Sequence, residues 1–157
     1  MKICFLDNSP IPYTSNDLNS KNIRGGENAI IHLSNELSKL GNNVLVYNSF
    51  KDICVISGVK WLNISHANKN LTYDIAFTNN DIKLFDKIIA KKYVAFSHSI
   101  QSIEKFIRKG QLFSYLKYKP KIVLLGKYHK ENRNYLLKLF GTINLEWAVD
   151  PLFLETK

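Results

Sequence analysis

The chain has 157 residues, 45% of them hydrophobic, and a formal net charge of +9. This length suits one ordinary domain with a substantial core, and the composition excludes a disordered protein. No apolar run approaches the roughly 20 residues that a membrane-spanning helix needs, and the charged Lys2 and Asp7 leave no room for a signal-peptide core, so we expect a cytoplasmic protein.

The first predicted element is a buried strand over residues 2–7, a short run rich in β-branched and aromatic residues. A polar loop over residues 8–24 follows, and its prolines and asparagines argue against any regular element. Loops of this length in compact domains are usually functional or disordered.

A helix is predicted to open at Gly25 and Gly26 and to end at Gly41, which stands where a left-handed C-cap is needed. Its apolar residues recur at helical spacing: Ile30, Leu33, Leu37 and Leu40. Two adjacent glycines let the backbone approach a ligand, and the helix start offers free amides and a positive dipole end. We therefore predict an anion site that suits a phosphate. The alternative is that the glycines only make a tight turn and that Glu27 only complements the helix dipole.

Strands and helices alternate along the rest of the chain. Strands are predicted over residues 43–47, 73–77, 92–96, 121–125 and 143–147, with one or two more within 51–64 and a turn at Gly58. Helices are predicted from Asp81 as N-cap through Ile89, over 103–109 and 112–119, and from Gly126 through Phe140. Continuous apolar strands between helices predict a three-layer, Rossmann-like α/β domain with a mostly parallel sheet.

Two polar residues follow strands of this predicted sheet. Asn79 follows the strand over 73–77, and His98 follows the strand over 92–96. Because ligands of open α/β sheets bind outside the carboxyl ends of the strands, both are candidates for the same rim as Gly25 and Gly26. A lone histidine is more often structural than catalytic, so that alternative stays open for His98. Arg24 is a candidate phosphate or acceptor contact, although an exposed loop arginine is the commoner case.

The order of strand, long loop, Gly25-Gly26-Glu27, amphipathic helix and strand resembles the start of GT-B glycosyltransferases of the family-four type. Near the end, Val149-Asp150 and Phe153 resemble the segment that crosses to the second domain in that family. The chain departs from the family's pattern at Trp147-Ala148, which replaces Asn-Gly, and at Gly126, which replaces a serine.

The resemblance implies that residues 1–157 form the N-terminal, acceptor-side half of a retaining hexosyltransferase, without the C-terminal donor-binding domain and inactive without it. The reaction would move a sugar from a nucleotide-diphosphate sugar to a glycan or lipid-linked glycan, as in polysaccharide biosynthesis. The resemblance implies diphosphate contacts at Gly25 and Gly26 and a catalytic contact from His98 to the donor sugar. It implies no metal and no cofactor. The alternative is a noncatalytic phosphosugar-binding module or one subunit of a split glycosyltransferase.

Positive charge is concentrated in residues 101–138, which contain ten Lys or Arg against Glu104 and Glu131. Within it, residues 102–121 interleave basic and apolar side chains, which predicts peripheral contact with the anionic inner face of a membrane. The alternative is that the apolar side chains pack on the sheet and the lysines are solvated. A nucleic-acid binder that stacks bases on aromatic residues of this segment is a rival, but no RNA-binding motif is visible, so we expect no nucleic acid.

The two cysteines, Cys4 and Cys54, are too few for a disulfide framework and lack the spacing of a metal site. We interpret both as small buried hydrophobes.

Overall fold

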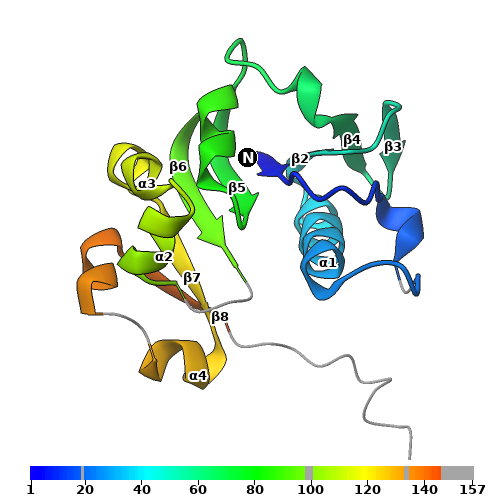
Figure 1. The fold of residues 1–157 in the computed structure, drawn as a ribbon. Helices are drawn as coiled ribbons and strands as arrows, with labels where there is room; N and C mark the ends of the chain where they lie inside the picture. Colours follow the sequence, from blue (N-terminus) through cyan, green and yellow to red (C-terminus); the bar gives the residue numbers. More distant parts are fainter. Residues whose placement is uncertain (19, 98–100, 133–134, 146–157) are drawn as a thin grey trace, which may run out of the picture.

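The computed structural model describes residues 1–18, 20–97, 101–132 and 135–145. Its centre is an 8-stranded sheet with the order β3-β4-β2-β1-β5-β6-β7-β8 (Figure 1). All neighbouring strands are parallel except β3 and β4, which are antiparallel. The predicted α/β class with a mostly parallel sheet is therefore confirmed.

The elements alternate along the chain as the periodicity predicts. The strands are β1 (Lys2–Leu6), β2 (Asn43–Asn48), β3 (Cys54–Ile56), β4 (Val59–Asn63), β5 (Thr72–Asn79), β6 (Ile89–Phe96), β7 (Lys121–Leu125) and β8 (Thr142–Leu145). The α-helices are α1 (Gly25–Lys39), α2 (Ile103–Arg108), α3 (Leu112–Tyr118) and α4 (Gly126–Glu131). The described residues also contain four 3-10 helices: η1 (Ser15–Asp17), η2 (Ile64–His66), η3 (Ile82–Lys87) and η4 (Tyr135–Phe140).

The sheet is buried on both faces, because successive side chains of a strand point to opposite sides. In β1, Ile3 and Phe5 pack in one cluster with residues of α1. Cys4 and Leu6 point the other way and join a second cluster that includes residues of η3, α2, α3 and η4. This arrangement explains why the central strands are continuous apolar runs.

The strand order contains a topological switch point between β1 and β5. From β1 the chain runs through α1 to β2 and then outward to β4, whereas η2 leads back across to β5 on the opposite side of β1. The run β4-β2-β1-β5-β6-β7 has the 3-2-1-4-5-6 order of dinucleotide-binding folds. Connections diverge at the carboxyl ends of β1 and β5, so a crevice is expected there.

The turn predicted at Gly58 is confirmed. Ser57 and Gly58 form the two-residue loop of the β3–β4 hairpin, with φ of 53° and 76°. Positive φ at both loop residues matches the right-handed twist of the flanking strands.

Two predicted helices are shorter than the sequence indicated. Asp81 is the N-cap as predicted, but η3 is a 3-10 helix that ends at Lys87, and Ile89 already pairs with Thr72 in the ladder between β5 and β6. The helix predicted from Gly126 through Phe140 is divided, because α4 ends at Glu131 and η4 follows separately.

The loop over residues 8–24 contains a regular element that the composition did not suggest. Thr14 and Asp17 form a capping box around the single turn of η1: the Thr14 side chain accepts from the backbone, and the Asp17 carboxylate accepts from the Thr14 amide at 2.8 Å. The crossing segment at residues 147–153 lies outside the described residues, as do the last two residues of the predicted strand 143–147.

The helix that begins at Gly25 ends as predicted, since Gly41 has a φ of 79° and its amide bonds the Ser38 carbonyl at 2.9 Å. Leu40 is 78% exposed and does not join the core, contrary to the helical pattern.

Cys4 is fully buried and Cys54 is half-buried. Within the part of the chain that the structure describes, no helix combines the length and apolar character needed to cross a membrane.

Candidate functional site

The candidate site lies where β1 and β5 end, at the switch point of the sheet. Asp7 follows β1, and Asn79 is the last residue of β5. Both side chains are buried, with 2% and 6% of their surface exposed. Because polar groups are costly to bury unless they are hydrogen-bonded, their partners define the structure of this edge.

Asp7 is the centre of the bonded network. Its carboxylate accepts hydrogen bonds from the Tyr13 hydroxyl at 2.8 Å, the Ser9 amide at 3.3 Å and Asn79 Nδ2 at 3.4 Å. Burial raises the pKa of Asp7, the donors Tyr13 and Ser9 oppose that rise, and the nearby charge of Glu27 adds to it. Asp7 therefore ties the strand end to the loop that follows it.

Glu27 extends this network to the first turn of α1. Its side chain is buried and accepts a hydrogen bond from the Ser9 hydroxyl at 2.6 Å. Glu27 thus holds the loop against the helix, in addition to complementing the helix dipole.

Tyr13 anchors the middle of the loop. Its side chain is fully buried and packs edge-on against Trp61, with ring centroids 5.9 Å apart. Its carbonyl accepts a hydrogen bond from Asn48 Nδ2 at 2.7 Å, at the end of β2. Burial and the adjacent Asp7 hold the pKa of Tyr13 well above its usual value, so its hydroxyl stays a donor. The loop is therefore fixed to the carboxyl ends of β1 and β2.

The α1 N-terminus contributes backbone donors to the same edge. Gly25 and Gly26 are the first two helical residues, and the Asn28 amide makes the bond to the Arg24 carbonyl at 3.0 Å. Arg24 is the N-cap residue and supplies no side-chain cap. The other five glycines have positive φ, whereas these two are the first residues of α1, and the alternative that they serve only the local backbone stays open.

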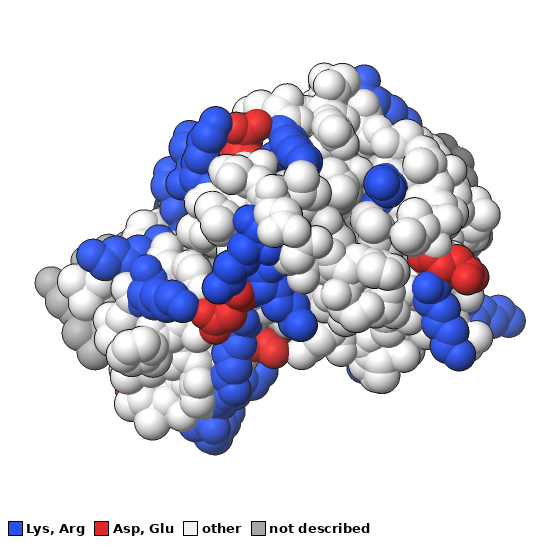
Figure 2. Space-filling view, turned by 90° about the horizontal axis from the view of Figure 1, so that it is seen from above, with Lys and Arg blue, Asp and Glu red and all other residues white. Residues whose placement is uncertain are grey.

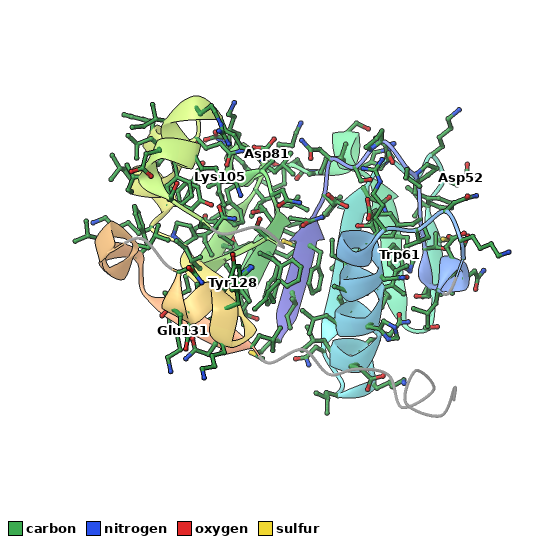
Figure 3. The ribbon with its side chains drawn as sticks, turned by 60° about the horizontal axis from the view of Figure 1, so that its bottom comes forward. Asp52, Trp61, Asp81, Lys105, Tyr128 and Glu131 are labelled. Atoms are coloured by element: carbon green, nitrogen blue, oxygen red, sulfur yellow. The ribbon has the colours of Figure 1, made fainter. Side chains whose placement is uncertain are left out.

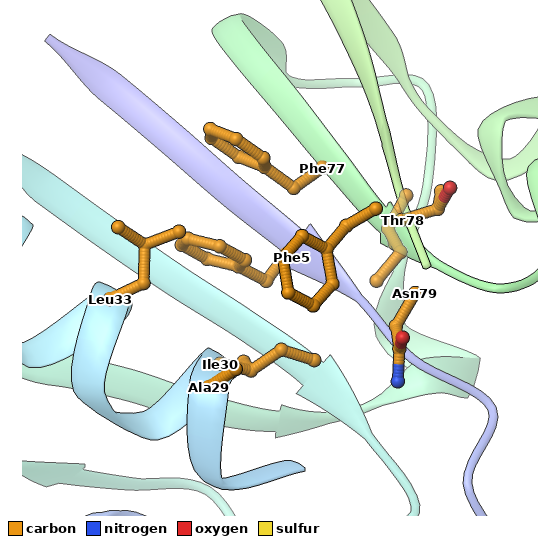
Figure 4. Close-up of a pocket in the computed structure, with 9 residues that line it drawn as sticks. Phe5, Ala29, Ile30, Leu33, Phe77, Thr78 and Asn79 are labelled. Atoms are coloured by element: carbon orange, nitrogen blue, oxygen red, sulfur yellow. The ribbon is translucent and has the colours of Figure 1, made fainter. Parts of the chain in front are cut away.

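A small apolar pocket lies under the first turns of α1 (Figure 4). Phe5 and Phe77 stack in its wall with ring centroids 4.7 Å apart. The Thr78 hydroxyl is buried there without a hydrogen-bond partner among the described residues. The remaining lining residues come from β1, α1, β5 and β6: Leu6, Ala29, Ile30, Leu33, Asn79 and Phe96.

The ends of β5 and β6 are also linked by polar side chains. Asn80 Nδ2 donates to Asn79 Oδ1 at 3.0 Å, and the Ser97 hydroxyl donates to Asn80 Oδ1 at 2.7 Å. Gln111 Nε2 donates to the Asn80 carbonyl at 3.2 Å. Asn80 itself is exposed and has a φ of 61°, so it lies at the accessible rim.

The structure brings some of the predicted site residues together. Asn79 is joined to the first turn of α1 through Asp7, Ser9 and Glu27, although its own amide group is bonded within the protein on both sides. Arg24 is exposed at the helix start. His98 lies outside the described residues, so its predicted role stays a prediction.

The sequence prediction did not include Asp7, Ser9 or Tyr13 in the site. A signal existed for Asp7, since a charged residue that closes a buried strand meets the same criterion that selected Asn79. No local pattern identifies Tyr13, because its position depends on how the loop folds back onto the sheet. Among the described residues, no group of three or more His, Cys, Asp or Glu side chains could hold a metal.

Searches against protein-family models, curated proteins and solved structures found no match to the chain. Functional inference therefore depends on the site's own chemistry. Backbone amides at the start of α1 can donate to an anion.

Proposed function

We propose that the chain is the acceptor-side half of a retaining GT-B glycosyltransferase, which binds the diphosphate of a nucleotide sugar at the start of α1. One observation carries this proposal. The uncapped N-terminus of α1, with Gly25 and Gly26 as its first residues, lies beside the β1–β5 switch point. Nucleotide ligands of doubly wound sheets bind at that position, with a phosphate group at a helix N-terminus.

The helix is long enough to supply a substantial dipole, since α1 has 15 residues. Glycines at its first two positions leave the backbone amides open to close approach. The carboxyl groups of Asp7 and Glu27 oppose an anion at this edge, because buried charges are poorly screened by solvent. The Tyr13 hydroxyl donates to Asp7 and the Ser9 hydroxyl donates to Glu27, and these hydrogen bonds offset part of the repulsion.

In this proposal, Gly25 and Gly26 contact the diphosphate and His98 contacts the donor sugar near its anomeric carbon. Arg24 and Asn79 are the candidate phosphate or acceptor contacts. The bond between the anomeric carbon and the diphosphate oxygen breaks, a glycosidic bond to an acceptor hydroxyl forms, and the hydroxyl proton is released. Amides at the helix start would stabilise the charge on the departing diphosphate. A second domain, in cis or in trans, would supply the nucleotide pocket.

The main alternative is a phosphosugar-binding module without catalytic activity, or one subunit of a split enzyme. It uses the same helix N-terminus, so a binding measurement alone does not separate it from the transferase. Sugar transfer after addition of a donor-binding domain would favour the transferase or the split enzyme over the noncatalytic module. In any preparation with transfer activity, His98→Ala should lower turnover more than it lowers stability.

Calorimetric titration of the chain with uridine and guanosine diphosphate sugars tests the proposed binding site. We expect weak binding by the wild type and at least a tenfold loss in Gly26→Val, because the added side chain blocks approach to the amides. His32→Val is the matched control, since His32 is an exposed residue farther along the same helix. Equal affinity of the two folded variants would contradict the assignment, and sugar transfer by the chain alone would contradict the division into halves.

A further inference from the structure

Helices α2 and α3 expose three large apolar side chains next to one tight connection. Ile107 is 59% exposed, Phe113 is 80% exposed and Leu116 is 53% exposed. Phe113 and Leu116 are three residues apart and therefore share one side of α3. The Gly110 amide bonds the Ile107 carbonyl at 2.9 Å, which closes the connection and keeps the end of α2 near the start of α3. We call these three residues, together with Arg108 and Lys109, the α2–α3 patch.

The exposed side chains are not needed to hold the two helices on the sheet. Phe106 and Tyr115 do that, since both are buried and their rings stack with centroids 3.5 Å apart. The sequence alternative, in which the apolar side chains pack on the sheet, is therefore correct for Phe106 and Tyr115 and wrong for the patch. Two large apolar side chains this exposed on one side of a helix, Phe113 and Leu116, are typical of an interaction surface.

The surroundings of the patch are basic. Residues 102–121 contain six Lys or Arg and one acidic residue, Glu104. Arg108 and Lys109 are exposed within the patch, and Lys83 Nζ from η3 lies beside Gly110. Lys117 is paired with Asp86 at 2.6 Å, so its charge is partly compensated. Figure 2 shows Lys and Arg side chains gathered over the half of the molecule that carries η3 and α3.

We propose that the α2–α3 patch docks on the surface of an anionic lipid bilayer. Apolar side chains that project from a basic helical surface can enter the headgroup–acyl boundary, while the neighbouring cations meet anionic headgroups. Docking of this kind needs only the projecting side chains of these helices of 6 and 7 residues, together with the neighbouring cations.

This inference is independent of the proposed sugar transfer, because the patch shares no residue with the α1 site. In Figure 3, Lys105 lies on the side of the molecule that carries α2, and Asp52 lies on the opposite side, near β3 and β4. Exposed residues near Asp52 therefore provide controls of the same chemical type, Lys51 and Ile53.

Cosedimentation with vesicles tests the proposal. Vesicles of phosphatidylcholine alone are compared with equimolar phosphatidylcholine and phosphatidylglycerol, at low and high salt. We expect binding to the anionic vesicles only, weakened by salt, and at least a tenfold weaker association in two double variants, Arg108→Glu with Lys109→Glu and Phe113→Ser with Leu116→Ser. The control variants Lys51→Glu and Ile53→Ser should bind as the wild type does.

Three results would overturn the proposal. One is an absence of binding to either kind of vesicle. Another is equal binding to neutral and anionic vesicles. The third is unchanged binding by Phe113→Ser with Leu116→Ser, which would show adsorption by charge alone. Circular dichroism of each variant checks that it is folded, and all the substituted side chains are exposed.

Discussion

Asp7 determines the structure of the loop that follows β1. Replacing it by alanine would leave the buried Tyr13 hydroxyl without the acceptor that it has at 2.8 Å. An unsatisfied buried donor costs about 1–3 kcal/mol, so we expect Asp7→Ala to lower the free energy of unfolding by roughly 2–3 kcal/mol in urea titrations. The exposed Asp52→Ala is the control and should change it by less than about 0.5 kcal/mol. Equal stability of the two variants would remove Asp7 from its proposed structural role.

The same residue predicts a pH dependence. Burial raises the pKa of Asp7 in the folded state, so its stabilising effect is complete below the unfolded pKa and is lost as the pH rises through the folded pKa. Asp7→Asn keeps an acceptor for Tyr13 and removes this titration. The stability of the wild type relative to Asp7→Asn should therefore fall between acid and neutral pH, as measured by urea unfolding at a series of pH values. If the difference in stability between the wild type and Asp7→Asn does not change with pH, then Asp7 has the same pKa in the folded and unfolded states, which would contradict this prediction.

Two glycines with different backbone conformations give opposite predictions. Gly25 is helical, so Gly25→Ala should be neutral or stabilising by up to about 1 kcal/mol while it weakens diphosphate binding. Gly58 has a φ of 76°, and an added Cβ would meet Ser38 Oγ, so Gly58→Ala should destabilise by more than about 1 kcal/mol. Thermal unfolding measures both. A destabilised Gly25→Ala with unchanged binding would mean that this glycine serves only the fold.

At the scale of elements, Asp81 joins three segments that are distant in sequence. Its carboxylate caps η3 through the Lys83 amide at 3.1 Å, accepts from Asn8 Nδ2 at 2.9 Å and accepts from Gln111 Nε2 at 3.2 Å. We expect Asp81→Ala to lower the free energy of unfolding by about 1–2 kcal/mol, as loss of a helix cap does. Asp81→Asn retains one acceptor oxygen and should lose less; a larger loss in Asp81→Asn would contradict the capping account.

The sequence was sufficient for most of the parallel strands, because their apolar runs reflect burial on both faces. It was misleading at Ile89, where the apolar spacing continued the helix but pairing with Thr72 places the residue in β6. Tertiary pairing outweighs local periodicity there. The start of α1 was predictable from Gly25 and Gly26, whereas Tyr13 was not, because its contacts with Trp61 and Asn48 come from residues far along the chain.

For the whole molecule, the strand order concentrates the candidate chemistry at one edge. The end of β1, the end of β5 and the first turn of α1 meet there, and Asp7, Ser9 and Glu27 bond them together. The α2–α3 patch, by contrast, shares no residue with this network. A ligand that binds at the switch point should therefore perturb a different set of amides from a ligand that binds the basic patch.

Amide NMR of the labelled chain during titration with uridine diphosphate tests the central claim most directly. The account predicts that the largest chemical-shift changes fall on the amides of Gly25, Gly26 and Glu27, and that Gly26→Val removes them while His32→Val keeps them. Changes confined to Arg108, Lys109 and their neighbours, or an absence of change at the start of α1, would contradict an anion site at the switch point.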